Sequence, residues 1–207
     1  MVDNAKLYTD RMDLAKYCEG EQCEMCRAES LGDYIARIKE GETPGGPCVH
    51  WSPAKIEAMR LAVESGKVLP EVPMLDMPRP VEPGLVGFNG PDASSSLLIT
   101  GNSEFTQAVL LAVCSMTSSP VRLLMVDVRG HTVDMAMVFK EMTVEGVKKG
   151  MDEHGAGITA DTRVVLPGLC ELLAPGLSDL IGHKVEVGPV CAAEIPLYMG
   201  EDWQPLG

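Results

Sequence analysis

The sequence predicts an α/β fold in which a parallel sheet follows a small, mainly helical N-terminal module. Three observations predict it: short apolar runs alternate with helix-like stretches after Ser96, a proline-rich stretch precedes them, and four of the seven cysteines gather near the N-terminus. Strand–helix alternation of this length favours a parallel sheet covered on both faces, of the Rossmann or flavodoxin type. We therefore divide the chain into a four-cysteine module (residues 1–66), a linker (67–95) and an α/β domain (96–207).

The regular part of the chain supplies four strands and four helical stretches. The apolar runs predict buried strands at 97–100, 121–127, 163–166 and 184–187. The stretches between and after them predict helices at 103–117, 132–152, 169–181 and 190–199. Each strand is thus followed by a helix, as parallel neighbours require.

The segment before the sheet is rich in proline, with prolines at 70, 73, 78, 80, 83 and 91. Proline has no backbone N–H and a fixed φ, so neither a helix nor a central strand accommodates this spacing. We expect an extended, semi-rigid linker between the two parts of the chain.

The N-terminal module contains two helix-like stretches, around residues 31–39 and from Ser52 to Gly66. The second begins S-P-A-K, which places a capping hydroxyl before a proline in the first turn. The cysteines therefore lie beside short helices.

Composition narrows the possible partners. The net charge is -13, and binding nucleic acid requires a basic face that releases phosphate counterions, so we expect no nucleic-acid partner. No apolar run approaches the roughly 20 residues of a membrane helix, and the N-terminus lacks the apolar centre of a signal peptide. We expect a cytoplasmic protein, in which seven cysteines point to metal or redox chemistry rather than disulfides.

Four cysteines form a candidate metal site with the spacing C-x4-C-x2-C-x21-C: Cys18, Cys23, Cys26 and Cys48. Thiolates suit both iron–sulfur clusters and zinc, and four of them complete either site. We favour an iron–sulfur cluster over structural zinc. The spacing also occurs in plant-type 2Fe–2S proteins, but the helical flanks favour 4Fe–4S. Three further cysteines, Cys114, Cys170 and Cys191, fall in the helical stretches and are expected to be buried packing residues.

A ligand crevice is expected at the carboxyl ends of the predicted strands, where open α/β sheets bind their ligands. The turns there are rich in glycine and proline: Gly101–Asn102, Asp127–Thr132, Pro167–Gly168 and Gly188–Pro189. No G-x-G-x-x-G or G-x-x-x-x-G-K-S/T pattern occurs, which argues against dinucleotide-binding and P-loop sites.

The α/β part resembles the corrinoid-binding domain of the large subunit of the corrinoid iron–sulfur protein, a methyl carrier. The resemblance lies in LLITGN (97–102), LLMVDVRGHTVDMAM (123–137), VVLPGLCELLAPGLSDLIGHKVEVGP (164–189) and AAEIPLYM (192–199). In the N-terminal module, PCVHWSPAKI (47–56) stands where that family has its fourth cysteine and the following helix. That family, however, spaces its first three cysteines as C-x2-C-x4-C and carries a barrel domain where this chain has the proline-rich stretch.

The resemblance implies roles for single residues. Thr106 matches the residue that faces the cobalt from below without strongly ligating it. The other implied corrinoid-binding residues are Gly101, Asn102, Asp127, Gly130, Thr132, Pro167, Gly168, Gly188, Pro189 and Ala192. Simpler roles stay open for several of them: a helix N-cap for Thr132, turn residues for the glycines and a surface hydroxyl for Thr106.

The function implied is that of a base-off corrinoid carrier for methyl transfer, whose cluster reactivates oxidised cobalt by supplying a low-potential electron. The expected partner is a methyltransferase or a redox protein, and we expect a carrier acting with such a partner more than a stand-alone enzyme. Two alternatives remain: an electron-transfer or corrinoid storage and delivery protein without methyl transfer, and a zinc-stabilised α/β module without corrinoid.

Overall fold

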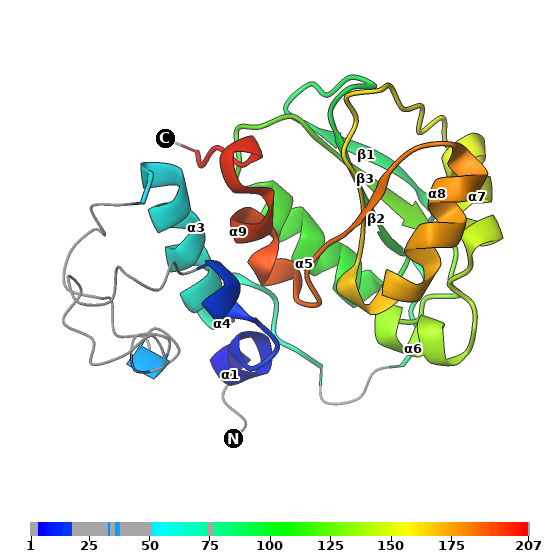
Figure 1. The fold of residues 1–207 in the computed structure, drawn as a ribbon. Helices are drawn as coiled ribbons and strands as arrows, with labels where there is room; N and C mark the ends of the chain where they lie inside the picture. The colour runs from blue at the N-terminus through cyan, green and yellow to red at the C-terminus, as the bar shows by residue number, and fades with distance from the viewer. Residues whose placement is uncertain (1–3, 18–32, 34–35, 38–50, 74–76, 207) are drawn as a thin grey trace.

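The computed structural model of this protein describes residues 4–17, 33, 36–37, 51–73 and 77–206 (Figure 1). Its strands are β1 (Gly84–Phe88), β2 (Ser96–Gly101), β3 (Val121–Val126), β4 (Val164–Leu166) and β5 (Val185–Val187). Its helices are α1 (Asn4–Thr9), α3 (Pro53–Val63), α4 (Ser65–Val68), α5 (Glu104–Cys114), α6 (Val133–Val138), α7 (Val144–Glu153), α8 (Ala174–Ile181) and α9 (Ile195–Met199). Short 3-10 turns are η1 (Leu14–Tyr17), η3 (Gly168–Leu173), η4 (Ala192–Glu194) and η5 (Gly200–Asp202).

The strands form one sheet in the order β1-β3-β2-β4-β5. Strands β2 to β5 run parallel, and only β1 is antiparallel. The parallel strands thus have the flavodoxin-like order, in which the chain leaves the first parallel strand to one side and later returns to its other side. The predicted α/β class, with its four parallel strands, is confirmed.

Strand β1 was not expected, because it lies inside the range assigned to the linker. It pairs with β3 from Gly84 opposite Met125 to Phe88 opposite Val121. An edge strand needs ladder hydrogen bonds on one side only, so prolines at 83 and 91 flank it without breaking it. The chain before β1 is also bound to the sheet, since the Val81 amide donates to the carbonyl of Asn102 at 2.9 Å.

Alternating side chains of the sheet enter two hydrophobic clusters, one on each face. Leu98, Leu123 and Met125 pack with helices α5 and α9. Leu97, Ile99 and their neighbours pack with α6, α7 and α8 on the opposite face (Figure 1). The result is the three-layer arrangement that fully buried parallel strands require.

The N-terminal helices form a further layer on the α5 and α9 side (Figure 1). Tyr8, Met12, Leu14 and Met59 are buried in the same cluster as the residues of α5 and α9. Helix α3 starts as the sequence predicts, with the Ser52 hydroxyl accepting a hydrogen bond from the Lys55 amide at 3.2 Å and proline in the first turn. The expected helix at 31–39 lies mostly outside the described residues. The three-part division of the chain stays a prediction.

The helix expected at 132–152 is two helices, α6 and α7. The chain turns between them at Lys140, which has a φ of 57°. Helix α7 then begins anew, because the Thr143 hydroxyl accepts from the Gly146 amide at 3.0 Å. The apolar periodicity of the sequence continues through this break, so the sequence alone predicted one helix.

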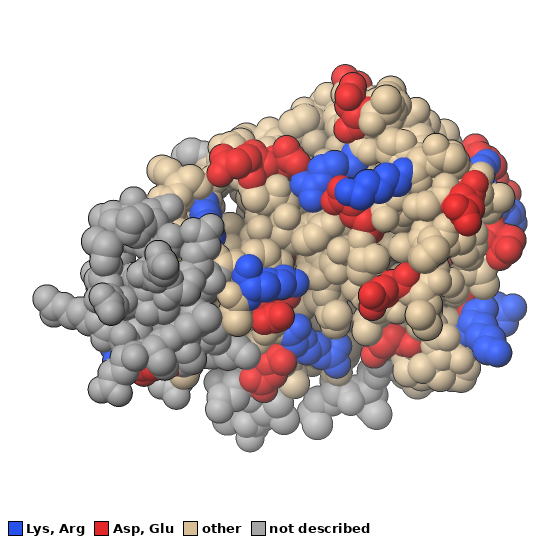
Figure 2. All heavy atoms as spheres, viewed as in Figure 1, with Lys and Arg blue, Asp and Glu red and all other residues tan. Residues whose placement is uncertain are grey.

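Among the helices described, none has both the length and the apolar character needed to cross a membrane. On the face shown in Figure 2, acidic and basic side chains are interspersed among uncharged ones.

Candidate functional site at the carboxyl edge of the sheet

A cavity of about 300 Å³ lies where strands β2 and β4 end. Its floor is made by Ile99 and Thr100 of β2 and by Val165 and Leu166 of β4. These two strands are neighbours, and the connections leaving them go to opposite sides of the sheet. The cavity therefore occupies the switch point at which open α/β sheets bind ligands.

The walls contain five of the residues predicted for the site: Thr106, Thr132, Pro167, Pro189 and Ala192. Thr106 lies in the first turn of α5, whose N-terminal end follows directly from β2. Thr132 is the N-cap residue of α6, and its hydroxyl donates to Asp134 at 2.6 Å. The structure thus brings together residues from the segments that follow β2, β3, β4 and β5, which are far apart in the sequence.

Asn102 lies beside the cavity and is not part of its lining. It is 2% exposed, and its amide side chain ties two loops together. Its Oδ1 accepts from the Val128 amide at 2.9 Å and the Gly130 amide at 3.2 Å, while its Nδ2 donates to the Val81 carbonyl at 2.8 Å. The side chain thus fixes the loop after β3 against the end of β2.

The predicted glycines keep this edge of the sheet compact. A methyl group on Gly101 would lie 2.4 Å from a methyl carbon of Val128, and one on Gly130 would lie 2.2 Å from the Pro80 nitrogen. Gly168 and Gly188 join the loops after β4 and β5, with the Gly168 amide donating to the Pro189 carbonyl at 2.9 Å. These glycines, like Asn102, shape the site from behind its lining.

Asp127 also lies outside the cavity lining. Its carboxylate accepts from the Arg129 amide at 2.9 Å in an exposed turn. Arg129 and Gly130 both have positive φ values, 56° and 78°, so this carboxylate stabilises a tight left-handed turn after β3.

The outer wall comes from a part of the chain that the sequence analysis did not assign to the site. Leu7, Tyr8 and Arg11 approach the cavity from the N-terminal segment, and Val72 and Pro73 lie beside them. The Tyr8 hydroxyl donates to the Pro70 carbonyl at 2.5 Å, and burial, with the charge of Cys191 second, raises the pKa of Tyr8 to about 12. No local pattern signals these contacts, because they depend on tertiary packing between distant segments.

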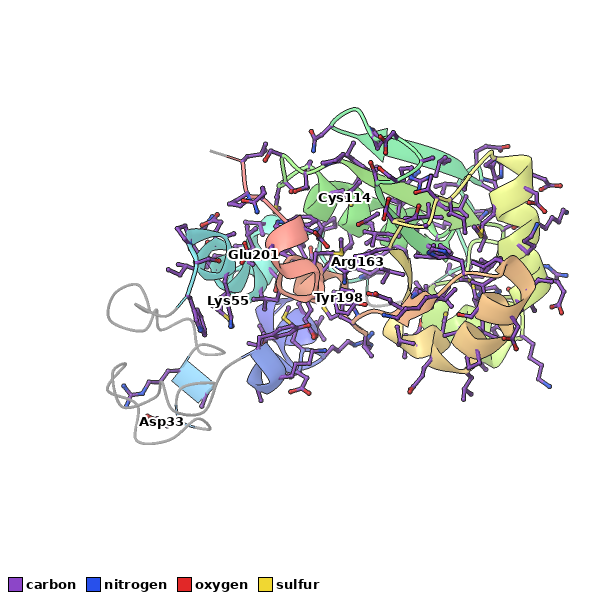
Figure 3. The ribbon with its side chains drawn as sticks, turned by 45° about the horizontal axis from the view of Figure 1, so that its top comes forward. Asp33, Lys55, Cys114, Arg163, Tyr198 and Glu201 are labelled. Carbon is purple, nitrogen blue, oxygen red and sulfur yellow. The ribbon has the colours of Figure 1, made fainter. Side chains whose placement is uncertain are left out.

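Tyr198 of α9 forms another part of the wall and is held from behind by charged residues (Figure 3). Its hydroxyl donates to Glu186 at 3.0 Å, and the Arg163 guanidinium lies 5.4 Å from its ring centroid. Glu186 also binds Arg163 at 3.0 Å. Burial alone would raise the pKa of Glu186, but hydrogen bonds from Arg163, Lys184 and Tyr198 outweigh it and lower this pKa.

The three cysteines of the α/β part are buried, which confirms them as packing residues. Cys191 also borders the cavity. Desolvation is the main cause that raises the pKa of its thiol to about 11, so the thiol is protonated near neutral pH.

The predicted metal ligands Cys18, Cys23, Cys26 and Cys48 lie outside the described residues. Within the described part of the chain, no three His, Cys, Asp or Glu side chains are grouped so that they could hold a metal ion.

Comparison with known proteins identifies the family. A family model described as the CO dehydrogenase/acetyl-CoA synthase delta subunit matches residues 66–199. The chain is 27% identical over 154 residues to the acetyl-CoA decarbonylase/synthase complex subunit gamma 2 of Methanosarcina thermophila, which covers 70% of this chain and 33% of that protein. It is 28% identical over 126 residues to the gamma subunit of Methanopyrus kandleri, covering 60% of this chain and 27% of that protein. The chain thus spans a third or less of the length of these curated relatives.

These findings correct the family named from the sequence. The resemblance pointed to the large subunit of the corrinoid iron–sulfur protein, whereas the matching model is that of the delta subunit of CO dehydrogenase/acetyl-CoA synthase. The match includes all five strands and the cavity residues from Val72 to Tyr198. Because it covers well over half of the sequence, this chain belongs to the CO dehydrogenase/acetyl-CoA synthase delta subunit family.

Proposed function

We propose that this chain binds a corrinoid at the carboxyl edge of its sheet and takes part in methyl transfer. The observation that carries the proposal is the cavity at the switch point between β2 and β4, lined by Thr106 and the loops after β4 and β5. The family supports it, as do relatives named as subunits of an acetyl-CoA decarbonylase/synthase complex.

The residues present fit the face and edge of a corrin ring. Phe105, Val109, Leu110 and Ile195 offer apolar contacts, and the loops after β4 and β5 bring backbone groups to the rim. A cavity of about 300 Å³ is at the small end of ligand sites, which span about 300–1,000 Å³. A complete corrinoid would therefore extend beyond this cavity, and we propose that the outer wall, Leu7 to Arg11, moves aside to admit it.

The lining also suits a corrinoid without a strong lower ligand from the protein. The uncharged polar side chains of the described lining are hydroxyls, phenols and the Cys191 thiol, and none of the described lining residues is a histidine. The raised pKa of Cys191, about 11, keeps that thiol protonated and a poor ligand. A bound corrinoid would supply the cobalt centre that accepts and donates the methyl group. Thr106 would orient the ring, and the apolar wall would exclude water.

The four N-terminal cysteines would hold an iron–sulfur cluster, and we favour 4Fe–4S. Its role would be to return oxidised cobalt to the active state by supplying an electron. The position of Tyr17 supports this pairing, because Tyr17 directly precedes Cys18 and its hydroxyl donates to Glu194 at 2.7 Å. Glu194 is two residues from Ala192 in the cavity wall. A methyltransferase or a redox protein would be the partner.

Anaerobic reconstitution with iron, sulfide and cobalamin tests the proposal directly. We expect about four irons and one cobalt per chain, with a base-off corrinoid spectrum. Reduction of the cluster should then change the cobalt spectrum. Zinc without cobalt would refute the proposal, and cobalt binding without methyl transfer to a thiol or a second corrinoid protein would indicate storage or electron transfer instead.

Filling the cavity should weaken corrinoid binding. Thr106→Phe places a ring inside the cavity, and we expect the dissociation constant for cobalamin to rise at least about tenfold, since about 1.4 kcal/mol of lost contact suffices. Ala108→Phe is the matched control, because Ala108 is exposed on the same helix and does not line the cavity. Equal effects of the two variants on cobalamin titrations would place the corrinoid elsewhere.

A further inference from the structure

Glu194 is a buried carboxylate whose polar partners come from a distant part of the chain. It lies in η4 and is 1% exposed. Lys16 Nζ lies 2.5 Å from Oε1, the Tyr17 hydroxyl donates to Oε1 at 2.7 Å, and the Asp13 amide donates to Oε2 at 3.4 Å. Among the described residues, the hydrogen-bond and ion-pair partners of this carboxylate thus all lie within residues 13–17.

The same two segments both contribute to the lining of the cavity. Tyr8 and Arg11 precede the residues that contact Glu194 and form part of the outer wall. Cys191 and Ala192 precede Glu194 and line the cavity as well, and Cys191 is buried in the same cluster as Tyr8. The carboxylate therefore fastens together two segments of the cavity wall.

Opening this fastening affects its two charges differently. The side chain of Lys16 is 43% exposed, so it keeps access to water in either state. Glu194 lies in η4, which also contacts α3 and α5, so residues 13–17 are not its only cover. A buried charge that loses its partner is strongly unfavourable, so the contacts to Glu194 hold residues 13–17 in place.

We propose that Glu194 is a positioning residue that holds residues 8–17 over the cavity, so that a ligand too large for the closed cavity binds in competition with the Glu194 contacts. The choice of a corrinoid as that ligand rests on the proposed function. The competition rests on the lining, because Tyr8 and Arg11 form part of the cavity wall and a ligand that needs more space on that side displaces them. The apparent affinity is then reduced by the fraction of molecules in the open form.

The contacts to Glu194 also attach the segment that directly precedes the first cysteine. Residues 13–17 lead directly into Cys18. Because Met12 and Leu14 are also buried in the shared core, the segment has both an apolar and an ionic attachment. The ionic attachment can be weakened alone by Glu194→Gln, which keeps the shape of the side chain and removes its charge.

The test begins with the ligand-free, full-length chain. In Glu194→Gln, we expect backbone amides of residues 8–17 to exchange hydrogen about tenfold faster, and trypsin to cleave after Arg11 and Lys16 about tenfold faster. Amides of β3 should exchange at the wild-type rate. Glu201→Gln is the control, because it makes the same change in an exposed glutamate that accepts a single hydrogen bond, from Ser52 at 3.4 Å, and does not contact residues 8–17 through any described hydrogen bond or ion pair. Unchanged exchange of residues 8–17 in Glu194→Gln would overturn the proposal.

Cobalamin titration then tests the competition. Glu194→Gln should bind cobalamin about tenfold more tightly than wild type, since more molecules are open. Faster exchange with unchanged or weaker cobalamin binding would overturn the competition. If neither protein binds cobalamin, the proposed function fails, and the exchange experiment still decides whether Glu194 holds the segment. Should β3 also exchange faster, Lys16→Met weakens the same contact from the exposed side and replaces Glu194→Gln in both measurements.

Discussion

Replacing Gly130 with alanine should lower the free energy of unfolding by about 3 kcal/mol, the sum of about 1 kcal/mol for an unfavourable φ and about 2 kcal/mol for overpacking. The φ of Gly130 is 78°, a conformation that L-residues rarely adopt. A methyl group there would also lie 2.2 Å from the Pro80 nitrogen and 2.5 Å from the Arg79 carbonyl carbon. Both neighbours are backbone atoms, so neither can rotate away. Urea unfolding, followed by circular dichroism, measures the loss.

Gly155→Ala separates the two contributions. Gly155 has a φ of 64°, but a methyl group there would meet no atom within 4 Å. This variant should lose only the backbone part, about 1 kcal/mol. Equal losses in the two variants would show that the approach of residues 79–80 to the loop after β3 does not limit stability.

Replacing Asn102 with alanine should lower the free energy of unfolding by about 3 kcal/mol, because each buried group left without a hydrogen bond contributes about 1–3 kcal/mol. The variant removes the acceptor for the Val128 and Gly130 amides and the donor to the Val81 carbonyl. Water cannot easily replace these contacts at a side chain that is 2% exposed. Chemical denaturation measures the effect.

Two further variants serve as comparisons for Asn102→Ala. Asn102→Asp keeps an acceptor for both amides but places a buried carboxylate oxygen against the Val81 carbonyl, so its loss should equal or exceed that of Asn102→Ala. Asp127→Ala removes a single exposed contact to the Arg129 amide and should lose at most about 0.5 kcal/mol. If Asn102→Ala were no worse than Asp127→Ala, the side chain would not be holding the two loops together.

The parallel strands could be predicted from the sequence because their signal is local. Strand β3 is buried at all six positions, and all of its residues except Arg122 are apolar. That arginine is buried as well, with its guanidinium donating to the carbonyls of Ala93, Ser95 and Gly157. Strand β1 has no comparable run and lies between prolines, so its pairing could not be inferred without the edge of β3.

The cavity could be predicted only in part. Turns after parallel strands place Thr106, Pro167 and Pro189 at one edge of the sheet by topology alone, and this is where the structure has them. The outer wall depends on Tyr8 and Arg11 packing against a sheet that begins about eighty residues later. The polar side chain of Asn102 suggested a contact with the ligand. In the structure, its polar atoms instead form hydrogen bonds with backbone groups of other loops.

The two borders of the sheet affect how copies of the chain can associate. A long flat border with unpaired backbone groups recruits strands from other molecules and starts aggregation. Here one border is β1, flanked by Pro83 and Pro91, and the other is β5, which is only three residues long and carries Glu186 next to Lys184. Proline, shortness and charge all oppose the addition of another strand. We therefore expect the folded chain to resist fibril growth through its sheet and to meet its partners through helices and loops.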